Sequence, residues 1–166
     1  MIKPFIIATC IVVAVNTISI KANDAPMSTE EMAQHCELSV EDFELFAGVV
    51  EAESNRQIPE EGELTTEGRE MIALVVWNRT YSESFPSDPR SVLCQRGQFS
   101  TVRGGVSCTQ PTSYSRQAVV NAYDLIHSGE EYPEVLFFNC ISFFRGRTPY
   151  PNPNGSNTFG GNYFSL

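Results

Sequence analysis

The stretch from Thr66 to Thr80 is the part of the sequence that most limits how this chain can fold. Met71, Leu74 and Val75 lie at positions that share one face of a helix. The remaining sides of the same helix also carry large apolar residues, namely Ile72, Val76 and Trp77. Because a helix that is apolar nearly all round is usually buried, we predict a central helix that the rest of the chain surrounds.

Two more helices are predicted, one before and one after this central helix. Ser39 opens a capping-box pattern, and apolar residues at helical spacing follow until the helix is expected to end near Ser54. Ser115 is expected to cap a third helix, which Gly129 would stop. The β-branched and aromatic run at 135–138 is typical of a strand.

Loop-rich segments make up much of the remaining chain. Proline and glycine interrupt 56–65 and 81–110, and 145–166 is rich in Pro, Asn and Gly. Residues 23–38 are polar and are interpreted as a loose lead-in to a single domain at 39–166. The predicted fold class is therefore α+β, mainly helical, with a smaller loop-rich lobe that contains short strands.

The first 22 residues differ in composition from the rest. Lys3 precedes an apolar run at 4–15, and a weaker stretch ends in the small residue Ala22. A basic start, an apolar centre and a small residue at the end are typical of an export signal. We therefore predict that residues 1–22 are removed and that no stable membrane span remains. The protein is then expected in the periplasm, the cell wall or the extracellular space.

The chain is strongly acidic. Its 20 Asp and Glu residues outnumber 11 Lys and Arg residues, which gives a formal net charge of −9 at pH 7. The predicted loss of Lys3 and Lys21 makes the mature chain more acidic still. Because such a surface does not attract nucleic acid or anionic lipid, we interpret the acidity as a source of solubility. We expect a monomer with no nucleic-acid partner.

Four cysteines remain once the first segment is removed: Cys36, Cys94, Cys108 and Cys140. An even number in an exported chain indicates two disulfides, with three pairings open. The short separation of Cys94 and Cys108 makes them the first candidate pair. The sequence has two histidines and no C-x-x-C motif, so we expect no zinc site.

Two carboxylates stand near the predicted end of the first helix. Glu51 follows Glu44 by seven residues, so it is predicted on the solvent-facing side. Glu53 follows Phe46 by seven residues and Val50 by three, so it extends the apolar face. Partial desolvation favours a neutral carboxyl group, which is the proton donor that glycosidic bond cleavage needs. An equally weighted alternative is that the helix ends earlier and Glu53 lies in water.

Four blocks of sequence occur in a fixed order along the chain. They read FAGVVEAE at 46–53, EGREMIALVVWNR at 67–79, QRGQFS at 95–100 and LFFN at 136–139. Together they resemble the SleB-type cell-wall hydrolases, the family of the spore cortex-lytic enzymes. The similarity extends over about residues 43–164. Each block is short, but their common order and spacing make the resemblance fairly specific.

The resemblance implies a lysozyme-like fold and an enzyme that cleaves peptidoglycan glycan strands between N-acetylmuramic acid and N-acetylglucosamine. The family's essential Glu falls on Glu53. In the family's usual chemistry this one Glu acts as acid and then as base, as in a lytic transglycosylase, without metal or cofactor. The resemblance also implies a cleft lined by substrate-binding residues of the last two blocks: Gln98, Phe99, Ser100, Phe138 and Asn139.

Some of these roles have alternatives. A turn held by Gln98 with Phe99 in the core is weighed equally with substrate binding. Asn78 lies on an apolar face of the central helix and is interpreted as a buried structural amide, which must be hydrogen-bonded. The chain departs from the family's pattern at 54–57, which replace small residues and glycine. It also departs near the C-terminus, where Asn162 stands in the place of a His.

Two other functions are compatible with the same features. One is a non-catalytic glycan-binding protein on the same scaffold, although retention of Glu53 counts against it. The other is a phage lysis enzyme whose first segment stays in the membrane until release, with Cys10 exchanging with another cysteine as a switch. Activity on purified cell walls tests the first alternative. The N-terminal residue of the exported protein tests the second.

Overall fold

The computed structural model describes residues 26–54, 63–139, 150–151 and 162–166, with side chains in the second range described from residue 67. These residues form five helices and four short strands, so the predicted α+β class is confirmed. The predicted export signal at 1–22 lies outside the described residues.

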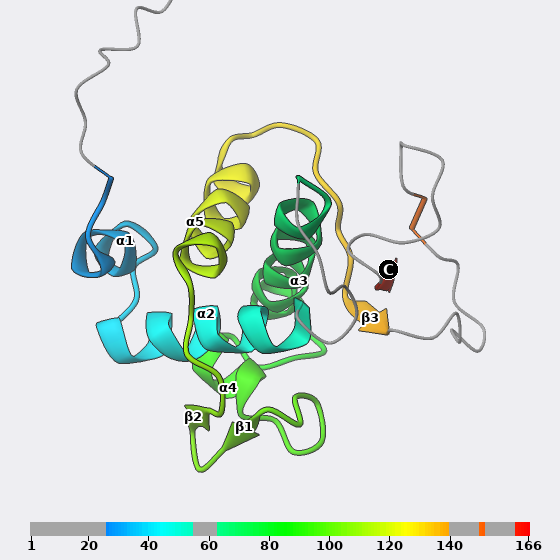
Figure 1. Cartoon of the computed structure of the whole chain (residues 1–166). Helices are drawn as coiled ribbons and strands as arrows, with labels where there is room; N and C mark the ends of the chain where they lie inside the picture. The colour runs from blue at the N-terminus through cyan, green and yellow to red at the C-terminus, as the bar shows by residue number, and fades with distance from the viewer. Residues whose placement is uncertain (1–25, 55–62, 140–149, 152–161) are drawn as a thin grey trace, which may run out of the picture.

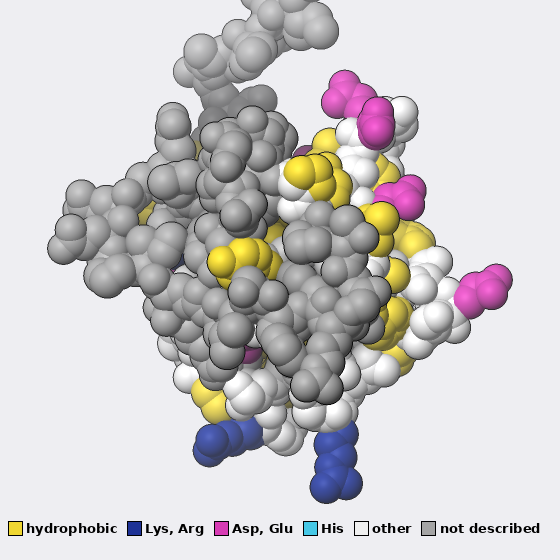
Figure 2. All heavy atoms as spheres, turned by 90° about the vertical axis from the view of Figure 1, so that its right-hand side faces the viewer, with side chains coloured by type: hydrophobic (Ala, Val, Ile, Leu, Met, Phe, Trp, Pro, Cys, Tyr) yellow, Lys and Arg dark blue, Asp and Glu magenta, His cyan; other side chains and the backbone are white. Residues whose placement is uncertain are grey.

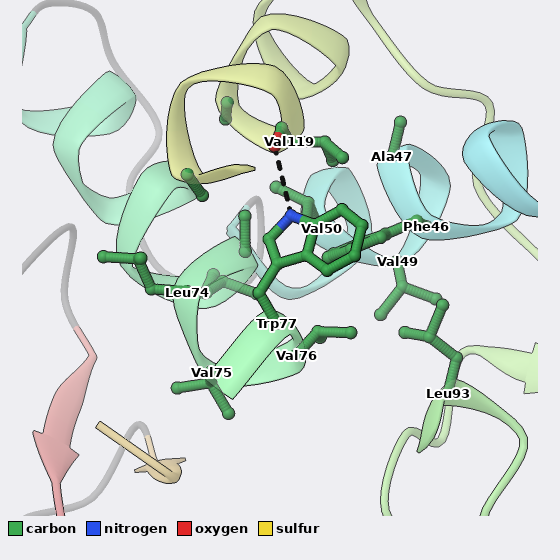
Figure 3. Close-up of a cluster of buried hydrophobic side chains, with 14 of the residues drawn as sticks. Phe46, Ala47, Val49, Val50, Leu74, Val75, Val76, Trp77, Leu93 and Val119 are labelled. Carbon is green, nitrogen blue, oxygen red and sulfur yellow. Dashed lines mark hydrogen bonds between the residues drawn. The ribbon is translucent and has the colours of Figure 1, made fainter. Parts of the chain in front are cut away.

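Three long helices form the centre of the molecule: α2 (Val40–Ser54), α3 (Glu63–Tyr81) and α5 (Ser113–His127). In Figure 1, α3 and α5 stand side by side and α2 crosses below them, and each helix packs on the other two. Trp77 of α3 lies where they meet (Figure 3). Its ring packs on Phe46 of α2 with 5.3 Å between centroids, and its Nε1 donates to the backbone oxygen of Val119 at 3.2 Å.

The central helix predicted at 66–80 is confirmed as α3, although it begins three residues earlier than expected. Every residue from Met71 to Arg79 is buried. This burial arises because α2, α4, α5 and β3 all contact α3. Burial of each large apolar side chain contributes roughly 1.5–3 kcal/mol, so α3 is a main source of stability.

Capping residues decide where the other two long helices begin. Helix α2 begins directly after Ser39, as predicted, because the Ser39 Oγ accepts from the backbone N–H of Asp42 at 3.1 Å. Helix α5 begins directly after Thr112, so Thr112 is its N-cap instead of the predicted Ser115. Ser115 is the third helical residue, and its Oγ accepts from the Thr112 N–H at 2.9 Å. Two hydroxyl residues three apart form a capping box here, and only the first marks the boundary.

The prediction of a loose lead-in at 23–38 is wrong for its described part, which contains helix α1 (Thr29–His35). Ser28 caps this helix: its Oγ accepts from the Glu31 N–H at 3.2 Å, and the Glu31 carboxylate accepts from the Ser28 N–H at 2.7 Å. The buried residues of the segment are Met32, Ala33 and Cys36. Because they join the core and α1 packs on α2 and α5, tertiary burial outweighs the polar composition.

The smaller lobe begins with helix α4 (Pro89–Leu93), which replaces part of the loop predicted at 81–110. Strands β1 (Val102–Arg103) and β2 (Val106–Ser107) follow as an antiparallel hairpin. Gly104 and Gly105 join the two strands with positive φ angles of 60° and 78°. Glycine adopts this left-handed region without a steric penalty, which explains why both turn positions are glycine.

The hairpin lies directly against α2 at Gly48. A Cβ added to Gly48 would lie 2.7 Å from the Cβ of Ser107 and 2.7 Å from the backbone oxygen of Thr109. Real Cβ atoms do not approach other heavy atoms so closely, so glycine is required for this contact. The close approach packs β2 against α2.

A second antiparallel pair joins β3 (Phe137–Asn139) to β4 (Tyr163–Ser165), with Phe138 opposite Phe164. Strand β3 confirms the strand predicted near 135–138. Of the two strands, β3 contacts α3, and Figure 1 shows the pair on the side of the molecule away from α1. Strand β3 therefore connects this pair to the helical core.

The predicted disulfide between Cys94 and Cys108 is wrong, because both thiols are free and exposed. The β1–β2 hairpin returns the chain so that the Cys108 N–H donates to the backbone oxygen of Thr101 at 2.9 Å. The hairpin thus places Cys108 beside the residue before β1. Cys36 is also free, and burial, with the nearby charge of Asp124, raises the pKa of its thiol to about 12. Cys140 lies outside the described residues.

The charged side chains on one face of the molecule are separated by sign. Figure 2 shows acidic side chains along its upper right edge and basic side chains at its lower end.

None of the helices in the described ranges is long and apolar enough to cross a membrane.

Candidate active site

The two carboxylates at the end of α2 have environments that reverse the predicted order of burial. Glu51, predicted on the solvent side, is 3% exposed, whereas Glu53, predicted on the apolar face, is half-buried. The prediction for Glu51 is wrong because α2 has no solvent-facing side here: every residue from Leu45 to Ala52 is buried. The alternative of an early helix end is also wrong, since α2 continues to Ser54.

Glu51 joins three helices through buried polar contacts. Arg69 of α3 donates from Nε to Glu51 Oε2 and from Nη2 to Glu51 Oε1, both at 3.3 Å. The hydroxyl of Thr112, the N-cap of α5, donates to Glu51 Oε2 at 2.7 Å. The side chains of Arg69 and Glu51 are 11% and 5% exposed. A buried carboxylate with a bidentate Arg and a hydroxyl donor is a structural link between helices.

Glu53 has a different partner, on the hairpin side of α2. The hydroxyl of Thr101 donates to Glu53 Oε1 at 3.3 Å. Thr101 is buried directly before β1, and its backbone oxygen accepts from Cys108 across the hairpin. The hairpin therefore fixes the donor that contacts Glu53. Glu53 itself is the second-last residue of α2, so it lies at the negative end of the helix dipole.

The predicted substrate-binding residues of the third block lie in the turn before Thr101. Gln98 and Ser100 are exposed, whereas Phe99 between them is 4% exposed. Phe99 thus has the position of a core aromatic, which is the alternative weighed in the sequence. Gln98 also holds a polar contact within the fold, since its Oε1 accepts from Arg79 Nη1 at 3.3 Å.

The predicted residues of the fourth block lie on β3. Phe138 is half-buried and Asn139 is exposed. The Phe138 ring lies 6.2 Å from the Phe99 ring and 5.9 Å from the Phe164 ring, between centroids. These aromatic contacts bring the two predicted substrate-binding segments, 98–100 and 138–139, together. Glu53 joins the same region through its contact with Thr101, two residues after Phe99.

Two residues of this region, Arg79 and Thr101, were not predicted. Arg79 lies in the second sequence block and Thr101 directly follows the third, but neither has a periodic or charge-pair signal that would mark it.

Asn78 is confirmed as a structural amide, because its Nδ2 donates to the backbone oxygens of Pro133 at 2.9 Å and Val135 at 3.0 Å. Asn162, just before β4, is buried and its Nδ2 has no hydrogen-bond partner in the described structure.

The described ranges contain no group of three or more His, Cys, Asp or Glu side chains placed to hold a metal ion. Among the described residues, the end of α2 offers the half-buried carboxyl group of Glu53 beside the hydroxyl donor of Thr101. Exposed amide and hydroxyl side chains lie in the adjoining turn and strand.

A sequence model of the family described as Cell Wall Hydrolase matches residues 63–157, more than half of the chain. The protein belongs to the cell wall hydrolase family. The matched residues of this cell wall hydrolase include the turn at 98–100 and the strand at 137–139, and they begin after Glu53. A search of curated proteins gave no match.

Two solved structures share the fold of this cell wall hydrolase. The catalytic domain of the Bacillus cereus SleB protein is 22% identical, with a TM-score of 0.57 over 77% of this chain and 91% of that one. The catalytic domain of the germination-specific lytic transglycosylase SleB from Bacillus anthracis is also 22% identical, with a TM-score of 0.58 over 77% of this chain and 96% of that one. The SleB-like fold predicted from the sequence is therefore confirmed.

Proposed function

We propose that this cell wall hydrolase cleaves the glycan strands of peptidoglycan between N-acetylmuramic acid and N-acetylglucosamine, with Glu53 as acid and then base. The observation that carries the proposal is the contrast between the two carboxylates of α2. Glu51 is held in a buried ion pair, whereas Glu53 is half-buried beside the turn at 98–100. Of the two, only Glu53 combines access to a ligand with partial removal from water.

The surroundings of Glu53 suit a proton donor. Partial burial favours the neutral form of a carboxyl group. The negative end of the α2 dipole also disfavours an added negative charge within the last helical turn. The Thr101 hydroxyl holds Oε1 in place, so the carboxyl group keeps one orientation relative to the turn. A general acid of this kind accelerates bond cleavage by roughly a hundred- to ten-thousand-fold.

The proposed reaction has two proton transfers, both at Glu53. In the first, Glu53 protonates the glycosidic oxygen while the bond from this oxygen to C1 of N-acetylmuramic acid breaks. In the second, the resulting carboxylate takes the proton from the C6 hydroxyl of the same sugar, whose oxygen bonds to C1. The product is a 1,6-anhydro sugar, no water is consumed, and Glu53 ends protonated as it began.

The environment of Glu51 supports this route over hydrolysis by water. A muramidase uses a second carboxylate, either to activate water or to act as a nucleophile. Glu51 is the neighbouring carboxylate on α2, and it already binds Arg69 and Thr112. The lytic transglycosylase activity named for the similar Bacillus anthracis domain agrees with a single-Glu reaction.

The remaining expectations accompany this proposal. Gln98, Ser100, Phe138 and Asn139 are proposed to contact the glycan, with Phe99 supporting them from the core. The protein is proposed to work as an exported monomer after removal of residues 1–22. An intact N-terminus on the exported protein would instead support a phage lysis enzyme whose first segment stays in the membrane until release.

Mass spectrometry of the muropeptides released from purified peptidoglycan tests the reaction. We expect products that end in 1,6-anhydro-N-acetylmuramic acid, since the C6 hydroxyl closes the ring. Products with a reducing N-acetylmuramic acid would show hydrolysis by water and contradict the transglycosylase route. Binding to peptidoglycan with no released product would support the non-catalytic glycan-binding alternative.

A further inference from the structure

A buried guanidinium lies beneath the turn that carries Gln98. Arg79, near the C-terminal end of α3, is 4% exposed. Its Cζ lies 4.9 Å from the ring centroid of Phe85, 5.5 Å from that of Phe137 and 5.7 Å from that of Phe99. Aromatic faces stabilise a desolvated cation, so these three rings stabilise the buried guanidinium.

Two N–H groups of Arg79 bind oxygens on different segments. Nε donates to the backbone oxygen of Leu136 at 2.9 Å, directly before β3. Nη1 donates to Gln98 Oε1 at 3.3 Å. The Gln98 backbone is also fixed, because its N–H donates to the backbone oxygen of Gln95 at 3.1 Å. Arg79 therefore links two segments that the proposed function assigns to substrate binding.

This contact decides which end of the Gln98 amide faces outward. A guanidinium has only N–H donors, so it binds the oxygen of an amide and not its nitrogen. The Gln98 oxygen is therefore directed to Arg79, and the amide nitrogen is directed away from it. Since the Gln98 side chain is exposed, the fold presents two N–H donors to whatever binds at this turn.

We propose that Arg79 is a positioning residue, which orients Gln98 so that its amide nitrogen donates to the carbonyl oxygen of an acetamido group on the glycan strand. The inference rests on the proposed function, because that substrate carries an acetamido group on each sugar. A hydroxyl group both donates and accepts, so it would suit either end of the amide. A carbonyl oxygen only accepts, so it gains from an amide held in one orientation.

Gln98→Glu separates the donor from the contact with Arg79. A carboxylate still accepts from Arg79, and more strongly than an amide, but it has no N–H to donate. On acetylated strands we expect KM to rise about tenfold with little change in kcat, as for one lost hydrogen bond in substrate binding. On chemically de-N-acetylated strands we expect the KM of Gln98→Glu to fall below the KM of the parent on the same strands. The reason is that the new carboxylate attracts the exposed amine of these strands.

Arg79→Lys tests the positioning role. Lysine keeps the charge but lacks the planar fork that binds Leu136 and Gln98 together. We expect KM on acetylated strands to rise several-fold, with a smaller preference for acetylated over de-N-acetylated strands. Thermal unfolding checks that the Arg79→Lys protein is folded. A change in kcat with the preference unaltered would mean that Arg79 is purely structural.

The outcomes are distinct. If the parent cleaves strands and Gln98→Glu has the parent's KM on both substrates, the acetamido contact is overturned and the proposed function stands. The same conclusion follows if KM rises equally on both. If the parent releases no product from either substrate, the proposed function itself fails.

Discussion

Glu51 and Glu53 lie two residues apart on one helix, yet their surroundings differ in every respect that matters for chemistry. Glu51 is buried, charge-paired with Arg69 and bound by Thr112. Glu53 is half-buried and contacts the hydroxyl of Thr101. The difference teaches that the more buried carboxylate is the structural one, because its burial is compensated by fixed partners. The proposed catalytic carboxylate is the one that a ligand can still reach.

The largest expected effect comes from Glu53→Gln. Gln has the size of Glu but cannot donate an acidic proton, so we expect product release from purified peptidoglycan to fall by about a hundred- to ten-thousand-fold. Stability should be unchanged to within about 0.5 kcal/mol in chemical unfolding, as is usual away from buried networks. Parental activity in the folded variant would contradict the catalytic assignment of Glu53.

Arg69→Met tests the structural role of Glu51, the other carboxylate of the comparison. It leaves the Glu51 carboxylate buried without its guanidinium, and breaking a buried pair in this way destabilises a protein by about 3–5 kcal/mol. Urea unfolding measures the loss. The control is the double variant with Glu51→Met, which should recover much of the stability because no buried charge remains. A single variant as stable as the parent would mean that the ion pair is not a structural link.

Glu51→Gln sharpens the contrast with Glu53→Gln, since both replace a carboxylate of α2 by an amide of equal size. We expect a loss of about 1–3 kcal/mol in unfolding free energy, because the buried Arg69 loses its charged partner. Cleavage per folded molecule should stay within a few-fold of the parent. A complete loss of cleavage in a folded Glu51→Gln protein would mean that Glu51, and not Glu53, is the catalytic carboxylate.

The smallest expected effect is that of Thr101→Val, which removes the hydroxyl that contacts Glu53. One hydrogen bond contributes about 1 kcal/mol, so we expect kcat to fall by roughly fivefold. Thr101→Ser keeps the hydroxyl and serves as the matched control, with activity close to the parent's. Equal kcat values for the two variants would show that this hydroxyl does not hold Glu53 in a productive position.

Local signals predicted the helical half of the fold well. The apolar stretch around Trp77 identified the central helix, and Ser39 identified the start of α2. Both signals depend on neighbours within a few residues, so a linear sequence contains them. The same reasoning missed α1, because its burial depends on packing against α2 and α5. It also placed the α5 cap at Ser115, where two hydroxyl residues made the local pattern ambiguous.

By itself, the sequence determined the α+β class, the three long helices, the SleB-like family and the candidate Glu53. The tertiary structure alone decided that Glu51 is buried and that Cys94 and Cys108 are free thiols. It also decided that Arg79 holds Gln98. The physical reason is range: helical spacing and capping act between near neighbours, whereas burial, ion pairing and hydrogen bonding join residues distant in the chain. The Glu51–Arg69 and Arg79–Gln98 contacts exist only once helices and turns have packed together.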